Sequence, residues 1–219
     1  MEKTDLSSIN HIVWDWNGTI LDDAHLCEEL TNIQLENLGL KPVGSETHQM
    51  VFQHPVEEYY RRLGAVLTPE EFCKLSEDFH AAYGRRRQEA GLRAGVRHFI
   101  ERLSEKGITH SVLSAYREED LVELIEECEM TRHFRAIVGL PNCHARSKVE
   151  RGAEWLRQEK LDPNRVILIG DTDHDFHAAT KMGIRCVLIP SGYQHWNILR
   201  RCGCPIFESF TAFEQSIFS

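Results

Sequence analysis

The chain has 219 residues, enough to bury a sizeable hydrophobic core, and it is large for one compact unit. Its 25 Lys and Arg residues stand against 34 Asp and Glu residues, and the formal net charge of -9 repels phosphate backbones and anionic lipid. This balance excludes nucleic acid and membrane surfaces as expected partners. No window is apolar over the roughly 18 residues that a membrane span needs, and no basic segment leads into a long apolar run at the N-terminus. We therefore expect a soluble, cytoplasmic protein.

The seven cysteines are odd in number and scattered along the chain. Most of them stand in helix-like or strand-like contexts, so we expect reduced thiols. The Cys202-Gly203-Cys204 triplet lacks the spacing of a zinc site, and its cysteines are expected to be ordinary small side chains.

Five short apolar runs rich in Ile and Val recur along the chain, with helical segments between them. This alternation predicts an α/β fold, a Rossmann-like doubly wound parallel sheet. The predicted strands are Ile9–Asp15, Ile108–Ser114, Phe134–Val138, Val166–Ile169 and Arg185–Ile189. The predicted helices of the second half are Glu118–Met130, Val149–Lys160 and Phe176–Met182, and Gly183 is expected to end the last of them.

The segment between the first two predicted strands is too long for a single crossover. Residues 24–90 carry apolar residues at helical spacing, beginning with Leu26, Leu30 and Ile33, and show no strand-like alternation. We predict a helical cap over residues 24–90, inserted into a core formed by residues 1–23 and 91–219. Glycines between 91 and 95 are expected to act as a hinge.

Acidic side chains stand where predicted strands end. Asp15 and Asp171 each follow an apolar run, and Asp175 follows Asp171 by four residues at the start of a helix. In an open parallel sheet, ligands bind beyond the carboxyl ends of the strands. Three crowded carboxylates would repel one another unless a hard cation lay among them, and oxygen ligands suit Mg²⁺. The cation needs an anionic substrate to complete its shell, and phosphate is the usual one.

Other polar residues near these ends suit phosphate chemistry. Gly18 and Thr19 form a turn whose N–H groups can face a phosphoryl oxygen. Ser114 can donate a hydrogen bond, Lys148 can supply a point charge, and the central Asp15 is the candidate nucleophile. Each of these residues alone is more often a helix cap or a turn former. The prediction of a phosphate site therefore rests on the order of four motifs, namely the turn after Asp15, the apolar run ending in Ser114, Lys148, and the stretch with Asp171 and Asp175.

This order of motifs resembles the haloacid dehalogenase superfamily of phosphotransferases over nearly the whole chain, and phosphoglycolate phosphatase-like members in particular. The matching stretches are WDWNGT, HSVLSA, Lys148 and IGDTDHD, and the likeness to the phosphoglycolate phosphatase-like members includes the closing segment SGYQHWNILRRCGC. The resemblance implies a helical C1 cap and a nucleophilic attack by Asp15 on phosphorus, giving an aspartyl-phosphate that water hydrolyses. It implies catalytic roles for Asp15, Asn17, Ser114 and Lys148, substrate contacts from Gly18, Thr19, Ser114, Ala115 and Lys148, and Mg²⁺ ligation by Asp15, Asn17, Asp171 and Asp175.

Asn17 departs from the family pattern, in which phosphatases usually carry a second Asp at this place. That Asp protonates the departing oxygen and later activates water, and an amide can do neither. The backbone carbonyl of Asn17 can still bind magnesium, so metal and phosphate binding should persist. General acid–base help is worth about a hundred- to ten-thousand-fold in rate, so we expect alkyl phosphates to suffer most and acidic leaving groups least.

Three functional classes remain open at this point. The first is a phosphatase of small phosphorylated metabolites, a monomer or weak homodimer, that acts on substrates with good leaving groups or recruits a proton from the substrate or the cap. The second is a phosphotransferase or a long-lived phospho-aspartate protein, and the third is a phosphate-binding pseudoenzyme that signals through its cap. A dehalogenase ranks below these because Asp171 and Asp175 would lose their metal-binding rationale.

Several other residues have weaker signals. His174 and His177 flank the acidic motif and are expected to face solvent or pack on a helix surface. The run Arg85–Arg87 is expected to be a solvated helix face, although one of its arginines is a candidate partner for a substrate anion. Arg117 and Arg146 are candidates for substrate contact. The sequence does not indicate where the side chains of the cap residues His54 and Tyr59 lie.

Overall fold

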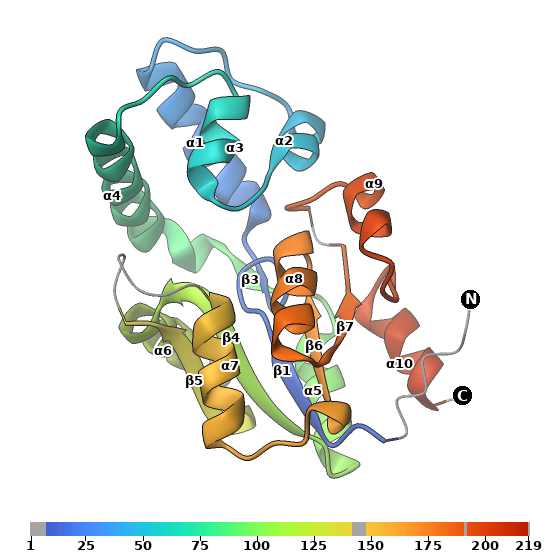
Figure 1. Ribbon diagram of the computed structural model, residues 1–219. Helices are drawn as coiled ribbons and strands as arrows, with labels where there is room; N and C mark the ends of the chain where they lie inside the picture. The colour runs from blue at the N-terminus through green and yellow to red at the C-terminus, as the bar shows by residue number, and fades with distance from the viewer. Residues whose placement is uncertain (1–7, 142–147, 191, 219) are drawn as a thin grey trace.

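A computed structural model gives the structure of the protein and describes residues 8–141, 148–190 and 192–218. Within these ranges, five parallel strands form one sheet in the order β5-β4-β1-β6-β7, and helices cover both of its faces (Figure 1). The strands are β1 (His11–Trp14), β4 (Thr109–Arg117), β5 (Ala136–Leu140), β6 (Val166–Gly170) and β7 (Arg185–Leu188). Each predicted strand is present, and the doubly wound α/β fold is confirmed.

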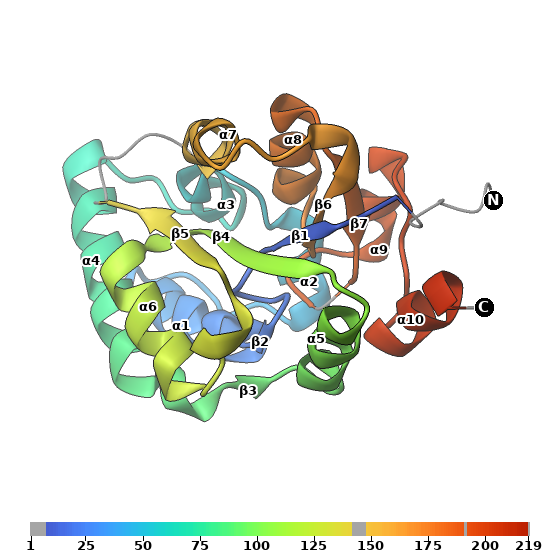
Figure 2. The same cartoon turned by 90° about the horizontal axis from the view of Figure 1, so that it is seen from below.

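The alternation of side chains along β1 divides the core into two layers. Ile12 and Trp14 pack with α5, α6 and α10 on one face, while Val13 packs with α7 and α8 on the other. Figure 2 shows these two layers on opposite sides of the sheet. Because both faces are covered, the strand is apolar without interruption. The covering helices are α5 (Val96–Glu105), α6 (Glu118–Glu127), α7 (Lys148–Gln158), α8 (Asp173–Met182) and α10 (Phe210–Phe218).

Helix α8 begins three residues before its predicted start, and this shift matters for the site. Thr172 forms a capping box with Asp175, in which the Thr172 N–H donates to Asp175 Oδ2 at 3.1 Å, and the Thr172 hydroxyl also donates to Asp175 Oδ2 at 2.8 Å. The helix ends at Gly183, as predicted, where φ is +70° and a residue without a Cβ is favoured. The capping box turns the Asp175 carboxyl back toward the end of β6.

Residues 24–86 form the helical insert, four helices that lie beyond the carboxyl ends of the sheet strands (Figure 1). A short antiparallel pair, β2 (Leu21–Asp22) and β3 (Gly91–Leu92), carries the chain out of the core and back. The helices are α1 (Ala24–Asn37), α2 (Ser45–Val51), α3 (Val56–Arg62) and α4 (Pro69–Arg86). The helices agree with the predicted helical segment, while its assignment as a separate cap domain stays a prediction.

The segment after β7 contacts both the insert and the core. Gln194 is 2% exposed, and its Nε2 donates to the carbonyl of Phe52 at 2.9 Å and to Asp173 Oδ1 at 2.8 Å. The remaining short helices are α9 (Trp196–Leu199), η1 (Arg87–Glu89), η2 (Thr131–His133), η3 (Pro163–Arg165) and η4 (Arg200–Cys202). No helix in the described ranges has the length and apolar character to cross a bilayer. The cysteines in those ranges are free thiols, and Cys143 lies outside them.

Candidate active site

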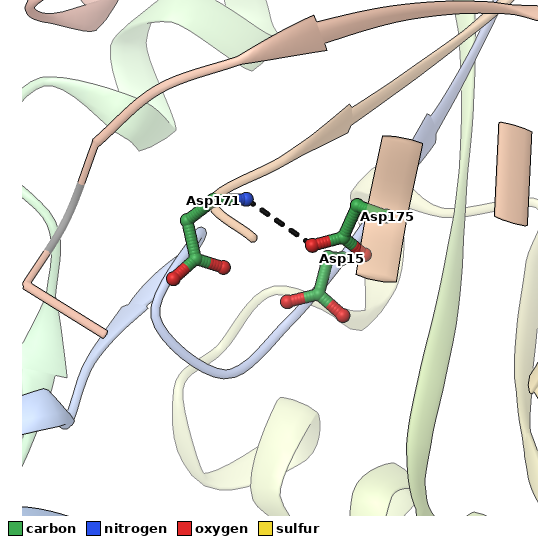
Figure 3. Close-up of side chains that lie close together, drawn as sticks. All are labelled: Asp15, Asp171 and Asp175. Atoms are coloured by element: carbon green, nitrogen blue, oxygen red, sulfur yellow. Dashed lines mark hydrogen bonds between the residues drawn. The ribbon is translucent and has the colours of Figure 1, made fainter. Parts of the chain in front are cut away.

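Three buried carboxylates meet at the carboxyl edge of the sheet (Figure 3). Asp15 follows β1, Asp171 follows β6, and Asp175 lies in the first turn of α8. Because β1 and β6 are paired neighbours in parallel register, residues that follow them come close together. One oxygen of each carboxylate lies within 4.8 Å of the other two, and the residues are 8%, 1% and 2% exposed. The structure thus brings together the three acids that the sequence singled out.

Hydrogen bonds orient two of these acids, Asp171 and Asp175. Thr19 Oγ1 donates to Asp171 Oδ1 at 2.9 Å, and the Asp171 N–H donates to Asp175 Oδ2 at 3.3 Å (Figure 3). The turn before Thr19 requires glycine, because Gly18 has a φ of +77° and a Cβ there would collide with the Tyr193 ring and the Asp171 carboxylate. The turn can therefore approach the acids closely without a side chain of its own.

Lys148 reaches the same cluster from the first residue of α7. Its Nζ donates to Asp15 Oδ1 and, at 2.6 Å, to Asp175 Oδ1. Burial lowers the pKa of Lys148, but the two carboxylates outweigh burial and raise it overall. Burial raises the pKa of Asp15 to about 7, against the attraction of Lys148. Burial also acts to raise the pKa of Asp175, yet its contacts with Lys148 outweigh this and lower it.

This donor set fits a hard divalent cation. Each acid offers a carboxylate oxygen, and three carboxylates against one ammonium leave an excess of two negative charges when all are ionised. Oxygen ligands and excess negative charge are what Mg²⁺ prefers. The residues that would hold it are Asp15, Asp171 and Asp175, with the backbone carbonyl of Asn17 expected from the sequence.

The Asn17 side chain contacts a fourth buried acid, Asp23. Its Nδ2 donates to Asp23 Oδ2 at 2.7 Å and to the Tyr83 hydroxyl at 2.9 Å, and Tyr83 itself donates to Asp23 Oδ2 at 2.6 Å. Burial raises the pKa of Asp23, while hydrogen bonds from Tyr83, Asn17 and the Gly18 N–H oppose the shift. A carboxylate at position 17 would face Asp23 in place of an amide donor. The amide therefore has a structural partner that the sequence did not reveal.

Ser114 and Ala115 belong to a longer strand than predicted. Strand β4 continues to Arg117, and its register with β5 shifts between Leu113 and Arg117. The expectation that the strand ends at Ser114 is wrong, because pairing with β5 resumes at Arg117 after the register shift. The Ser114 hydroxyl accepts the Tyr116 N–H at 3.1 Å, so its own hydrogen is available to a ligand.

These residues line the acidic cavity, a space of about 330 Å³ between the core and the insert. His54 and His174 meet in its wall with ring centroids 4.4 Å apart. His174 is half-buried there, which corrects the expectation that it faces solvent or packs on a helix surface, whereas His177 is exposed. Burial lowers the pKa of His54, and lowers that of His174 to about 4. The lining residues are Asp15, Asn17, Phe52, His54, Val56, His80, Ser114, Ala115, Tyr116, Lys148, Asp171, Thr172, His174, Asp175 and Tyr193.

The candidate arginines contact carboxylates of the protein. Arg86 pairs with Glu29 and Glu89, Arg87 with Glu123 and Glu127, and Arg117 with Asp120. The Arg87 side chain is 10% exposed, so this part of the run is not the solvated face expected from the sequence. Arg146 lies outside the described residues.

Residues of the site that sequence reasoning missed come mainly from the insert and from the segment after β7. Asp23, Phe52, His80 and Tyr83 had no distinguishing motif, and Tyr193 lies in the segment SGYQHWNILRRCGC, from which no site residue was predicted. Asp23 stands in the stretch WDWNGTILDD beside the equally acidic Asp22, and only the buried hydrogen bonds separate the two.

Comparison with known proteins agrees with this geometry. The model of the haloacid dehalogenase-like hydrolase family matches residues 12–189. The chain is 24% identical over 195 residues to a phosphoglycolate phosphatase of Pseudomonas fluorescens, covering 84% of this chain and 70% of that protein. It is also 24% identical over 183 residues to the tyrosine-protein kinase PtkA of Mycobacterium tuberculosis, covering 83% of this chain and 62% of PtkA. A haloacid dehalogenase-like hydrolase from Streptococcus pneumoniae has the same fold, with a TM-score of 0.81, 20% identity and coverage of 95% and 98%. The chain therefore belongs to the haloacid dehalogenase-like hydrolase family.

Proposed function

We propose that this chain is a Mg²⁺-dependent phosphatase of small phosphorylated metabolites that works through an aspartyl-phosphate on Asp15. The observation that carries the proposal is the buried cluster of Asp15, Asp171 and Asp175 with Lys148 in contact. The phosphoglycolate phosphatase relative supports it. At 24% identity, this relative supports the reaction class and does not identify phosphoglycolate as the substrate of this chain.

Each residue of the cluster has a role in this reaction. Bound Mg²⁺ would supply the positive charge that lets an anionic phosphoryl group approach a carboxylate. An Asp15 oxygen attacks phosphorus as the bond to the leaving oxygen breaks, and water then hydrolyses the acyl phosphate and returns the carboxylate. Lys148 holds phosphoryl oxygens as a point charge, and the Ser114 hydroxyl and the Gly18 turn donate hydrogen bonds to them.

Asn17 restricts this chemistry to particular leaving groups. Its amide cannot supply a proton to the departing oxygen, and its Nδ2 is held by Asp23 and Tyr83. Loss of general acid–base help costs about a hundred- to ten-thousand-fold in rate. Substrates whose leaving groups depart without a proton are therefore favoured.

Two further expectations from the sequence join the proposal. Residues 24–90 act as a cap that closes over the acidic cavity and excludes water, which strengthens the electrostatic interactions around phosphorus. The monomeric or weakly dimeric state and the cytoplasmic location stay predictions.

The direct test is hydrolysis of an aryl phosphate with and without magnesium. We expect phosphate release that EDTA abolishes and magnesium restores, and we expect Asp15→Asn to abolish it. Magnesium uptake should be measured by calorimetry on the same samples. Binding of phosphate mimics without turnover of aryl or acyl phosphates would establish a pseudoenzyme instead.

The second candidate is a phosphotransferase with a long-lived phospho-aspartate. Two observations favour it, namely the amide at position 17, which cannot activate water for the second step, and the similarity to PtkA, a protein named as a tyrosine kinase. Acid quenching followed by mass spectrometry distinguishes the two. A phosphorylated Asp15 that survives for minutes and disappears faster with an added acceptor would support transfer over hydrolysis.

A further inference from the structure

A second cavity lies inside the helical insert, beside the acidic cavity. This insert cavity has a volume of about 200 Å³ and is bounded by residues of α1, α2, α3 and α4, grouped at the top of Figure 1, and by Gly192 and Tyr193. The two cavities share four lining residues, Phe52, Val56, His80 and Tyr193. The two cavities are therefore neighbours that meet at these four side chains.

Aromatic rings form much of the wall of the insert cavity. They belong to Phe52, Tyr59, Tyr60, Phe72, Phe79 and Tyr193. The tyrosine hydroxyls are already bonded, that of Tyr59 to His48, that of Tyr60 to Gln34, and that of Tyr193 to Cys27 Sγ at 2.9 Å. Since the polar ends of these side chains have partners within the protein, an occupant meets mainly ring faces and edges.

The charges of the insert cavity disfavour a second anionic group. Among the described residues that line it, Glu28 is the acid and no Lys or Arg occurs. Phosphoglycolate carries a carboxylate on its leaving group, and that carboxylate would face Glu28 without a cation to pair with. The cavity is suited to a neutral and apolar group.

The volume of the insert cavity limits the size of its occupant. A dry cavity of about 150 Å³ lined by apolar side chains is large enough to bind benzene. The insert cavity, at about 200 Å³, accommodates one aromatic ring with small substituents.

The leaving-group argument and the cavity converge independently on one class of substrate. Aromatic alcohols leave more readily without a proton than alkyl alcohols do, which suits a site with an amide at position 17. We propose that the substrate is an aryl phosphate monoester whose single neutral ring occupies the insert cavity, an inference that rests on the proposed phosphatase function. The Asp15 oxygen bonds to phosphorus as the phosphorus–oxygen bond to the ring breaks. The aryloxide leaves with the electron pair and takes its proton from water.

The first test measures binding without turnover. Phenylphosphonate and methylphosphonate are titrated into the magnesium-loaded protein by calorimetry. Burial of a ring in the insert cavity should make phenylphosphonate bind about tenfold more tightly or better. Equal affinities would overturn the inference, and because phosphonates are not hydrolysed, this result does not depend on whether the protein is a phosphatase.

A cavity-filling variant with a matched control locates the site. Ser76 lines the insert cavity and is absent from the acidic cavity. We expect Ser76→Phe to remove the preference for phenylphosphonate and leave methylphosphonate binding unchanged, while Ser76→Ala keeps both. A folded Ser76→Phe protein with the full preference would contradict the assignment.

A charge change in the insert cavity gives a second variant should Ser76→Phe not fold. Glu28→Lys should raise the affinity for phosphonoacetate relative to phenylphosphonate about fivefold or more, because a carboxylate would then meet a cation. An unchanged ratio would place the substrate outside this cavity.

Kinetics separate the inference from the proposed function. Phenyl phosphate is compared with a small fluorinated-alkyl phosphate whose alcohol has similar acidity, so that only the ring differs. We expect kcat/KM for phenyl phosphate to be about tenfold higher. Equal turnover of both overturns the ring-binding inference and leaves the phosphatase standing. Turnover of neither, with the phosphonate preference retained, rejects the phosphatase and leaves the ring site standing.

Discussion

The acidic cavity and the insert cavity share part of their wall, yet they are built in different ways. The acids of the first follow two paired strands and are hydrogen-bonded to their immediate surroundings. The second is lined by ring faces from separate helices, whose chain positions span residues 24–80 and 192–193. The comparison teaches that backbone topology places the three acids, whereas side-chain packing between helices shapes the insert cavity.

Replacing Lys148 should give the largest effect and tests whether the acidic cavity acts on every substrate alike. Lys148→Met should lower kcat about a hundred- to a thousand-fold on aryl and alkyl phosphates equally, because the phosphoryl group loses a cation. Without magnesium, the free energy of unfolding should also fall by about 3–5 kcal/mol, because Asp15 and Asp175 lose their buried partner. The readouts are steady-state kinetics and urea denaturation. A loss confined to aryl substrates would place Lys148 in ring binding.

Asn17→Asp tests whether the missing acid or the insert cavity limits the substrate range. We expect turnover of alkyl phosphates to rise about a hundredfold and that of aryl phosphates much less, because only the former needs a proton. The new carboxyl group faces Asp23, so stability should fall by about 1–3 kcal/mol.

The matched control exchanges the two groups. Asn17→Asp combined with Asp23→Asn restores a donor–acceptor pair, and we expect the lost stability to return while the gain on alkyl phosphates remains. If neither protein changes the ratio of alkyl to aryl turnover, position 17 does not set the substrate range.

Low pH should lower the free energy of unfolding through His110, a buried histidine of strand β4. Burial and the charge of His133 lower the pKa of His110 to about 4, and the ring accepts a hydrogen bond from Trp14 Nε1 at 3.1 Å. The pKa of His110 in the folded protein lies below its unfolded value near 6.5. The stability that the neutral ring contributes is therefore fully present above pH 6.5 and is lost as the pH falls toward 4. The loss at pH 4 should be about 2–3 kcal/mol.

The check is urea denaturation between pH 7 and pH 4. His110→Gln keeps an acceptor for Trp14 and should make the decline shallower, while His98→Gln at an exposed position should not. An unaltered decline in His110→Gln would assign acid sensitivity to other groups.

The smallest effect is expected at Arg87, at the return from the insert to the core. Its side chain pairs with Glu123 and Glu127 of α6, which are 63% and 32% exposed. Arg87→Met should cost about 1 kcal/mol of stability and leave KM within about twofold, because these pairs are partly solvated and Arg87 does not line the acidic cavity. A large rise in KM would show that Arg87 contacts the substrate.

The core was predictable because its signals are local. A strand covered on both faces is a continuous apolar run, and the polar residue at its end lies at the ligand-binding edge of the sheet. Asp15 and Asp171 met both conditions, and Asp175 needed only one helical turn to join them. The register shift after Leu113 and the early start of α8 were not predicted. The first depends on pairing with β5, and the second on the capping box of Thr172 and Asp175.

The sequence by itself determined the family, the doubly wound sheet and the acids at its rim, since these follow from periodicity and from spacings of a few residues. Only the tertiary structure decided that Asn17 is held by Asp23 and Tyr83, that His54 lies on His174, and that the insert encloses a ring-sized cavity. Helical periodicity indicates which face of a helix is buried. It does not indicate which helix covers that face or how completely the side chains fill the space, because these depend on the packing of segments far apart in the chain.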